Sequence, residues 1–325
     1  AELAARGHAV TVIARFGPNA SSAAAGMIAP AMESLIDGLS PAHAALLRRA
    51  RDLWPAFAGR HELDLYLDGA EWRGPEPDAA VARLHALEFA AERAGEGLFT
   101  PDDWRVDARR SLAVLSRVPG VTCVDATVSA LRYAAGWWTA VCDDDQSRSA
   151  PALVLATGAA AALDGLPETV AARVNAIQPI RGQLTPVDCP SPGRVVRAPG
   201  IYATPARDGV LFGATMEPGS RDLTPDPDTT ARQLGMGLAL TGGAGEAGPP
   251  RVGIRGASPD GLPMAGPSGA PGLHLALAPR RNGWLLGPLV GRIVADGIEG
   301  RAPLADAAAL SPLRFVNPPA ARSAG

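Results

Sequence analysis

Cysteine is scarce in this chain, and its pattern excludes two kinds of stabilised site. Of the 325 residues only three are cysteines, and Cys123, Cys142 and Cys189 lie far apart. An odd number at wide spacing provides neither a disulfide framework nor the closely spaced ligand pairs of a structural zinc site. Scarce, unpaired cysteine is typical of a reducing compartment, so the sequence predicts a cytoplasmic location.

The chain also lacks an excess of basic residues and long apolar runs. The formal net charge is −3, so no basic surface argues for nucleic acid or an anionic membrane as a partner. No apolar run is long enough to span a bilayer. The first ten residues lack the basic start and apolar core of a signal peptide, and the chain begins with Ala1 rather than Met.

The composition that is present predicts a globular protein. Hydrophobic residues make up 47% of the chain and charged residues 19%, which is enough apolar material for a large core. The length allows two domains. The N-terminal residues have the pattern of the second half of a βαβ unit: a helix end, Gly7 as a left-handed cap, and a buried strand over 9–14. The strand and Gly-rich phosphate loop GxGxxG that would form the first half of this unit do not stand ahead of these residues in the sequence.

Several later segments predict the parts of a ligand-binding α/β protein. The run SSAAAGM at 21–27 consists of small residues with no helical or strand period. It would let backbone lie against a flat ligand, although a flexible linker has the same composition. The apolar strand 153–158 would end at the crevice where α/β sheets bind ligands. Segments 177–185, 200–204 and 209–215 predict strands of an antiparallel sheet in a second domain. The Ala/Pro-rich tail after Pro303 is expected to fray.

The stretch 280–297, RRNGWLLGPLVGRIVADG, predicts a helix with an unusual beginning. Apolar residues recur at helical spacing, so the helix should begin near Trp284 or Leu285 and end by Gly297. The Asn-Gly pair at its start replaces the Ser, Thr or Asp of an ordinary cap. Free N–H groups there favour negative charge, and a neighbouring arginine can hold a carboxylate. These residues alone fit an ordinary basic loop before a core helix at least as well.

Six segments taken together resemble a known family. They are SSAAAGM at 21–27, LVLATG at 153–158, IRGQL at 180–184, YATPARDGVLFGATMEPG at 202–219, GIRGASPDGLPMAG at 253–266 and RNG at 281–283. In this order and spacing they resemble the FAD-dependent D-amino-acid-oxidase family. Within that family the match is best to the branch that oxidises glycine for thiamine biosynthesis.

The resemblance implies an α/β (α+β) fold with two interleaved domains. A Rossmann-like FAD-binding domain would comprise residues 1–60, 100–175 and 251–325. A substrate-binding domain built on an antiparallel sheet would comprise residues 61–99 and 176–250.

The resemblance also implies roles for individual residues. The substrate carboxylate would be held by Arg255, Arg281 and Tyr202, and Met216 would line the pocket over the flavin. Val128 would lie near the adenine, and Thr157 and Gly158 along the cofactor chain. The remaining cofactor contacts would come from two segments, the small-residue loop beneath the flavin ring (Ser22, Ala23, Ala24, Ala25, Gly26 and Met27) and the helix start at its O2 edge (Asn282, Gly283, Trp284, Leu285 and Leu286).

The reaction implied is FAD-dependent oxidative deamination of glycine or another small amino acid. Hydride would pass from Cα to flavin N5, O2 would reoxidise the flavin to give H2O2, and the imine would hydrolyse to a 2-oxo acid and ammonia. No metal is implied, and a homo-oligomer is left open. A dehydrogenase of the same fold with another electron acceptor, and a flavin-free scaffold or fragment without activity, are the alternatives.

The chain departs from the family pattern in three places. The phosphate loop does not stand ahead of the N-terminal residues, so we expect residues 1–325 alone to bind FAD poorly. Ala14 and Arg15 stand where the family has a ribose-binding acid. Ala278, Pro279 and Arg280 replace the usual Gly-His pair before RNG.

Overall fold

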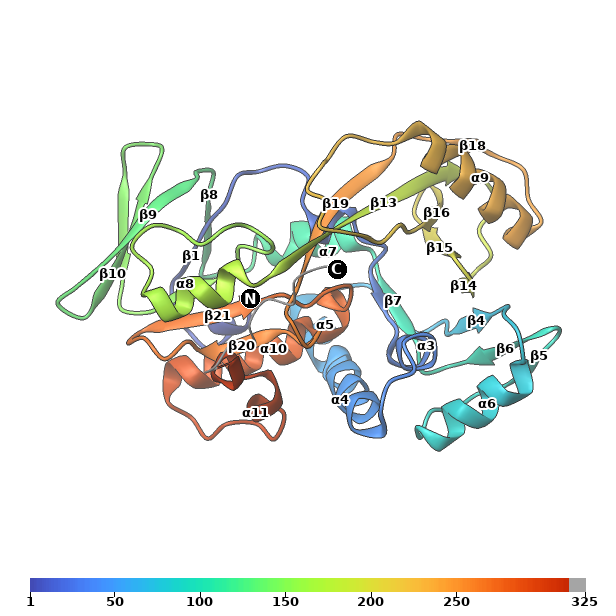
Figure 1. Ribbon diagram of the computed structural model, residues 1–325, viewed down its shortest axis with the longest axis horizontal. Coiled ribbons are helices and arrows are strands. Elements are labelled where there is room, and N and C mark those ends of the chain that lie inside the picture. The colour runs from blue at the N-terminus through green and yellow to red at the C-terminus, as the bar shows by residue number, and fades with distance from the viewer. Residues whose placement is uncertain (316–325) are drawn as a thin grey trace, which may run out of the picture.

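Parallel strands and the helices on them form one side of the molecule. The computed structural model describes residues 1–315. Strand β1 (Val10–Ile13) pairs in parallel with β8 (Val121–Val124), and β12 (Leu153–Leu155) pairs in parallel with β21 (Leu273–Leu277). This part occupies the left of Figure 1. The other strands of this part are β20 (Met264–Pro267), antiparallel to β21, and the three-stranded meander of β9 (Val128–Ala134), β10 (Trp137–Cys142) and β11 (Ser147–Ala150).

A large antiparallel sheet forms the other side. Its main path runs β17-β13-β16-β15-β14-β4-β6-β5, and β18 and β19 also pair with β13. All its pairs are antiparallel except β14 with β4. The strands are β4 (Ala70–Trp72), β5 (Glu92–Ala94), β6 (Gly97–Thr100), β13 (Gln178–Asp188), β14 (Val195–Ala198), β15 (Ile201–Ala206), β16 (Gly209–Gly213), β17 (Glu217–Pro218), β18 (Glu246–Ala247) and β19 (Arg251–Ala257).

Strands β13 and β19 extend from the large sheet toward the first part, as Figure 1 shows. A small sheet of β2 (Met27–Ile28), β7 (Trp104–Val106) and β3 (Leu65–Tyr66) provides a second connection. The helices are α1 (Glu2–Ala5), α2 (Ala20–Ala23), α3 (Pro30–Ile36), α4 (Pro41–Asp52), α5 (Trp54–His61), α6 (Pro77–Ala86), α7 (Ala108–Leu115), α8 (Glu168–Asn175), α9 (Pro227–Thr241), α10 (Gly283–Glu299) and α11 (Ala307–Leu310), followed by the 3-10 turn η1 (Pro312–Phe315).

Helix α10 is the central helix of the first part. Its side chains Leu285, Leu286 and Leu289 are buried with the apolar faces of α4 and α5. Its other neighbours are β20 and β21. None of the described helices has the length and apolar character needed to cross a bilayer. The predicted mixed α/β fold with Rossmann-like and antiparallel sheets is confirmed.

Four local expectations from the sequence were wrong. Helix α10 continues past Gly297 to Glu299, because Gly300, at φ 64°, forms the left-handed cap. The small-residue run contains a short helix, α2, capped by Asn19. Strand β1 is half exposed, with Val12 at 42%, since among the described residues it pairs only with β8. Residues after Pro303 form α11 and η1 up to residue 315 because Leu310 is fully buried; 316–325 lie outside the described residues.

Candidate active site

A cavity between the large sheet and the start of α10 brings together many of the residues singled out in the sequence. Arg255, Arg281, Tyr202 and Met216 all line it. The small-residue loop and the α10 start contribute Ala24, Ala25, Gly26, Met27, Asn282 and Trp284. The same cavity is lined by Glu33, Arg197, Trp72, Ile36 and Leu184, which the sequence patterns did not single out.

Arg255 projects from β19 across the neighbouring strand β13. A Cβ atom added at Gly182 of β13 would lie 2.1 Å from Nη1 of Arg255, so only glycine leaves room for this guanidinium. Nη1 donates to the backbone oxygen of Thr215 at 3.1 Å and lies 3.4 Å from the sulfur of Met216. Arg255 forms no ion pair with a carboxylate among the described residues, and burial lowers the pKa of its guanidinium. A half-buried, unpaired charge of this kind is suited to a carboxylate ligand.

Tyr202 lies in the middle of the sheet, beside Arg197. The two residues are directly opposite each other on β15 and β14, so their side chains are on the same face. On its other side Tyr202 faces Gly213, where an added Cβ would lie 2.9 Å from the phenol oxygen. Burial raises the pKa of Tyr202 to about 12. The phenol therefore stays protonated at neutral pH and can donate a hydrogen bond.

Arg281 is held in place by two carboxylates of the chain itself. Its Nε donates to Oε2 of Glu33, and its Nη2 lies 2.9 Å from Oδ1 of Asp37. The Asp37 contact is at ion-pair distance without the angles of a hydrogen bond, and Nη2 is buried with no hydrogen-bond partner among the described residues. Arg280 also pairs with Asp37, at 3.0 Å, and does not line the cavity.

Glu33 is shared by two arginines. Its second oxygen, Oε1, accepts from Nη1 of Arg197 at 2.9 Å, while Oε2 accepts from Arg281. The Glu33 and Arg197 side chains are only 5% and 8% exposed. Burial alone would raise the pKa of Glu33, but the attraction of Arg197 and Arg281 outweighs it and holds the pKa below its usual value. Glu33 is therefore an ionised carboxylate in the wall of the cavity.

Helix α3 carries Glu33 into the cavity, and its start is capped by a side chain from another segment, Asp103. The carboxylate of Asp103 accepts from the backbone N–H groups of Ala31 at 2.8 Å and Met32 at 3.1 Å. Asp103 thus caps a helix whose own cap residue, Ala29, has no suitable side chain. A sequence signal was available in retrospect, because Glu33 and Arg197 are single charges inside otherwise apolar segments.

The small-residue loop is held by close backbone contacts. At Gly253 of β19 an added Cβ would lie 2.9 Å from Cα of Ala20, so α2 packs directly on this strand. Gly26 has φ 76° and its oxygen accepts from the N–H of Val106 at 2.9 Å. The indole of Trp284 donates to the oxygen of Ser21 at 3.2 Å, which joins the loop to the start of α10.

The start of α10 offers unused backbone donors. Asn282 makes no side-chain capping hydrogen bond, so the first N–H groups of this 17-residue helix have no side-chain partner. Leu285 and Leu286 are 0% and 2% exposed, which leaves only their backbone available to a ligand. An uncapped helix start beside a loop of small residues fits a flat cofactor that accumulates negative charge, as a flavin does on reduction.

The other predicted cofactor residues do not line the cavity. Ser22 and Asn19 form a reciprocal capping box at the start of α2, and Ala23 of the same helix is buried. Val128 lies in β9 against the core around β12 and β21. Thr157 is exposed in the turn after β12. Gly158 follows it with φ 65°, and Gly283 begins α10.

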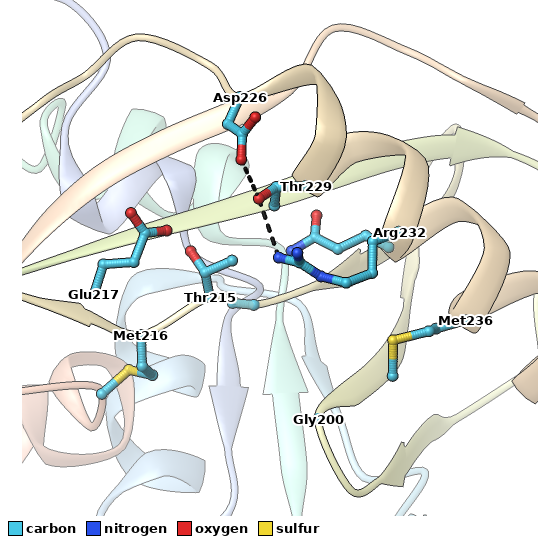
Figure 2. Close-up of a pocket in the computed structure, with 10 residues that line it drawn as sticks. Gly200, Thr215, Met216, Glu217, Asp226, Thr229, Arg232 and Met236 are labelled. Carbon is cyan, nitrogen blue, oxygen red and sulfur yellow. Dashed lines mark hydrogen bonds between the residues drawn. The ribbon is translucent and has the colours of Figure 1, made fainter.

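A second hollow, drawn in Figure 2, shares Met216 with the cavity. It encloses about 460 Å³ against about 230 Å³ for the cavity. Its carboxylates are already engaged: Glu217 pairs with Arg181 at 2.7 Å, and Asp226 accepts from Thr229 at 2.5 Å. Its arginine, Arg232, donates to Oγ1 of Thr229 at 3.1 Å. The smaller cavity is the candidate active site because it gathers Arg255, Arg281 and Tyr202. Its walls share Gly200, Ala214 and Met216 with the second hollow.

The match to known proteins defines the class. The family model for DAO, the FAD dependent oxidoreductases, matches residues 1–297. The chain therefore belongs to this family, whose cofactor is FAD, and the predicted family and cofactor are confirmed.

Individual relatives narrow the comparison. The chain is 30% identical over 369 residues to glycine oxidase of Geobacillus kaustophilus (strain HTA426), a match covering 97% of this chain and 93% of the relative. It is 29% identical to the bifunctional protein ThiO/ThiG of Synechocystis sp., covering 95% of this chain and about half of that protein, 51%. A match at 34% to glycine oxidase of Pseudomonas aeruginosa covers 42% of the chain and 39% of the relative.

Solved structures agree on the fold. The crystal structure of glycine oxidase from Geobacillus kaustophilus superposes with a TM-score of 0.81 at 27% identity, covering 97% of this chain and 94% of that one. The crystal structure of iminodiacetate oxidase from Chelativorans sp. BNC1 superposes with a TM-score of 0.82 at 22% identity, covering 95% of this chain and 94% of that one. At this identity the similarity shows the fold alone. The chain is thus a glycine-oxidase-like member of the family.

Proposed function

We propose that this protein oxidises a small amino acid or a closely related amine, with FAD as electron acceptor and O2 as the final oxidant. The observation that carries the proposal is Arg255, a half-buried cation without a carboxylate partner among the described residues, in one cavity with the neutral phenol of Tyr202. The relatives named glycine oxidase make glycine the first substrate to test.

The chain's own residues would bind and orient the substrate. The free N–H groups of Arg255 and the hydroxyl of Tyr202 would hold the carboxylate, with Arg281 as a further cation in the same wall. FAD, when bound, supplies the acceptor for a hydride from the substrate Cα. The small-residue loop Ala24–Met27 and the start of α10 would hold its ring. The described cavity wall has no histidine, and Glu33 is committed to two arginines, so the amine would bind in its neutral form.

Met216 would limit the substrate side chain. It stands between the cavity and the second hollow, and its sulfur contacts Arg255. A short substrate such as glycine or sarcosine fits on the near side of this wall. Longer side chains would have to displace it, although methionine is adaptable.

The test is a spectroscopic titration of the FAD-loaded full chain. We expect glycine or sarcosine, added without oxygen, to bleach the flavin absorbance, and air to restore it with release of H2O2. Failure of every small amino acid to bleach bound flavin would contradict the proposal. Bleaching that an artificial quinone reverses but air does not would identify a dehydrogenase. A chain that retains no flavin under any loading condition would be a scaffold.

A further inference from the structure

The charges in the cavity wall do not balance. Among its described lining residues three arginines, Arg197, Arg255 and Arg281, face a single carboxylate, Glu33. Asp37 and Arg280, just behind, pair with each other at 3.0 Å and leave the surplus unchanged. The wall therefore carries two more positive than negative charges. An amino acid with its amine neutral, as oxidation requires, brings one negative charge.

Arg197 is positioned to bind a second negative charge of the substrate. It is 7% exposed and donates only Nη1 to Glu33, at 2.9 Å. Its Nε and Nη2 have no hydrogen-bond partner among the described residues. It lies directly opposite Tyr202 in the sheet, so the two side chains emerge next to each other. A buried guanidinium with unused donors is costly unless a ligand completes its hydrogen bonds.

From this surplus and the position of Arg197 we infer that the preferred substrate is an amine carrying two carboxylates. One carboxylate is held by Arg255 and Tyr202, the other by the free edge of Arg197. Oxidation is unchanged in kind: the Cα–H leaves as hydride to FAD, the nitrogen lone pair forms the C=N bond, the nitrogen loses its proton, and water cleaves the imine. The inference rests on the proposed function and specifies its substrate class.

Two pairs of substrates that differ by one carboxylate test it, and the first pair has nearly equal shape. D-Aspartate is compared with D-asparagine, and iminodiacetate with sarcosine, by kcat/KM of the FAD-loaded full chain. Binding is measured separately by calorimetry with malonate against acetate, which are not oxidised. We expect each dicarboxylate to exceed its monocarboxylate partner by about ten- to a hundred-fold, because one charge-assisted contact is gained.

Arg197→Gln should remove most of this preference, measured as the ratio of malonate to acetate affinity. Arg197→Lys should restore part of it, since the charge returns without the planar fork. Arg207→Gln is the matched control, because Arg207 is exposed in the β15–β16 turn, outside the cavity.

Equal kcat/KM within each pair, or an Arg197→Gln variant that weakens acetate as much as malonate, would overturn the inference and leave amino-acid oxidation standing. Tighter malonate binding that depends on Arg197, in a protein that oxidises none of the four substrates, would support the charge argument and contradict the proposed function.

Discussion

The guanidinium of Arg281 is pinned from behind by Asp37, whose Oδ1 lies 2.9 Å from Nη2, while its Nε is committed to Glu33. A substrate carboxylate therefore meets an arginine whose position is set before binding. Preorganisation of this kind reduces the entropy lost when the ligand is ordered. Arg255, by contrast, is positioned by backbone contacts and by the absence of a side chain at Gly182.

Replacing Glu33 by Gln should destabilise the protein by about 3–5 kcal/mol at neutral pH, because the buried Arg197 and the half-buried Arg281 lose their shared carboxylate. The pKa of Glu33 is lowered in the fold, so its contribution is present above its unfolded pKa of about 4.3 and is lost as pH falls through the folded value. Chemical unfolding at pH 7 and at stepwise lower pH measures this. The wild-type advantage over Glu33→Gln should shrink on acidification. Glu96→Gln, at an exposed site, is the control, and an advantage independent of pH would contradict the assignment.

Arg281 and Arg280 should differ in their effect on substrate binding. Arg281→Ala should raise KM by roughly one to two decades, as expected for the loss of a charge-assisted hydrogen bond. Arg281→Lys should recover only part, because a point charge cannot replace the fork. Arg280→Ala should change KM little, since Arg280 pairs with Asp37 and does not line the cavity. Steady-state kinetics of the three FAD-loaded variants decides the matter. If Arg281→Ala leaves KM unchanged and Arg280→Ala raises it strongly, Arg280 rather than Arg281 is the substrate ligand.

Gly182→Ala should impair the site without unfolding the protein. The new Cβ would collide with the end of the flexible Arg255 side chain, which can move aside and leave the carboxylate site. We expect KM to rise about tenfold or more, with the melting temperature nearly unchanged. Gly235→Ala is the matched control: this glycine of α9 has nothing within 4 Å of an added Cβ. A normal KM in Gly182→Ala would show that Arg255 is not a substrate ligand.

Met216→Ala should widen substrate choice. Because Met216 separates the cavity from the second hollow, its removal should join the two spaces (Figure 2). We expect the ratio of D-phenylalanine to glycine turnover, compared as kcat/KM, to rise about tenfold, the scale at which a pocket discriminates small apolar groups. Met236→Ala changes the second hollow alone and should leave the ratio unchanged. An unchanged ratio in Met216→Ala would mean that another group limits the side chain.

The sequence by itself determined the family, the mixed fold, and the motif positions that gather Arg255, Arg281, Tyr202 and the small-residue loop around one cavity. These features are local. Glycine runs, a helix start and strand patterns keep their meaning wherever the chain places them. Their roles in binding remain predictions, as does the division of the chain into two domains.

Only the tertiary structure decided how the charges combine. Arg197 and Glu33 are 164 residues apart in sequence, and each on its own is a single charge in an apolar segment. Whether such a charge is neutralised, shared or left for a ligand depends on which strands and helices pack together. Strand β14 and helix α3 come into contact only in the folded protein. The need for glycine at Gly182 has the same origin, because the side chain that requires the space comes from another strand.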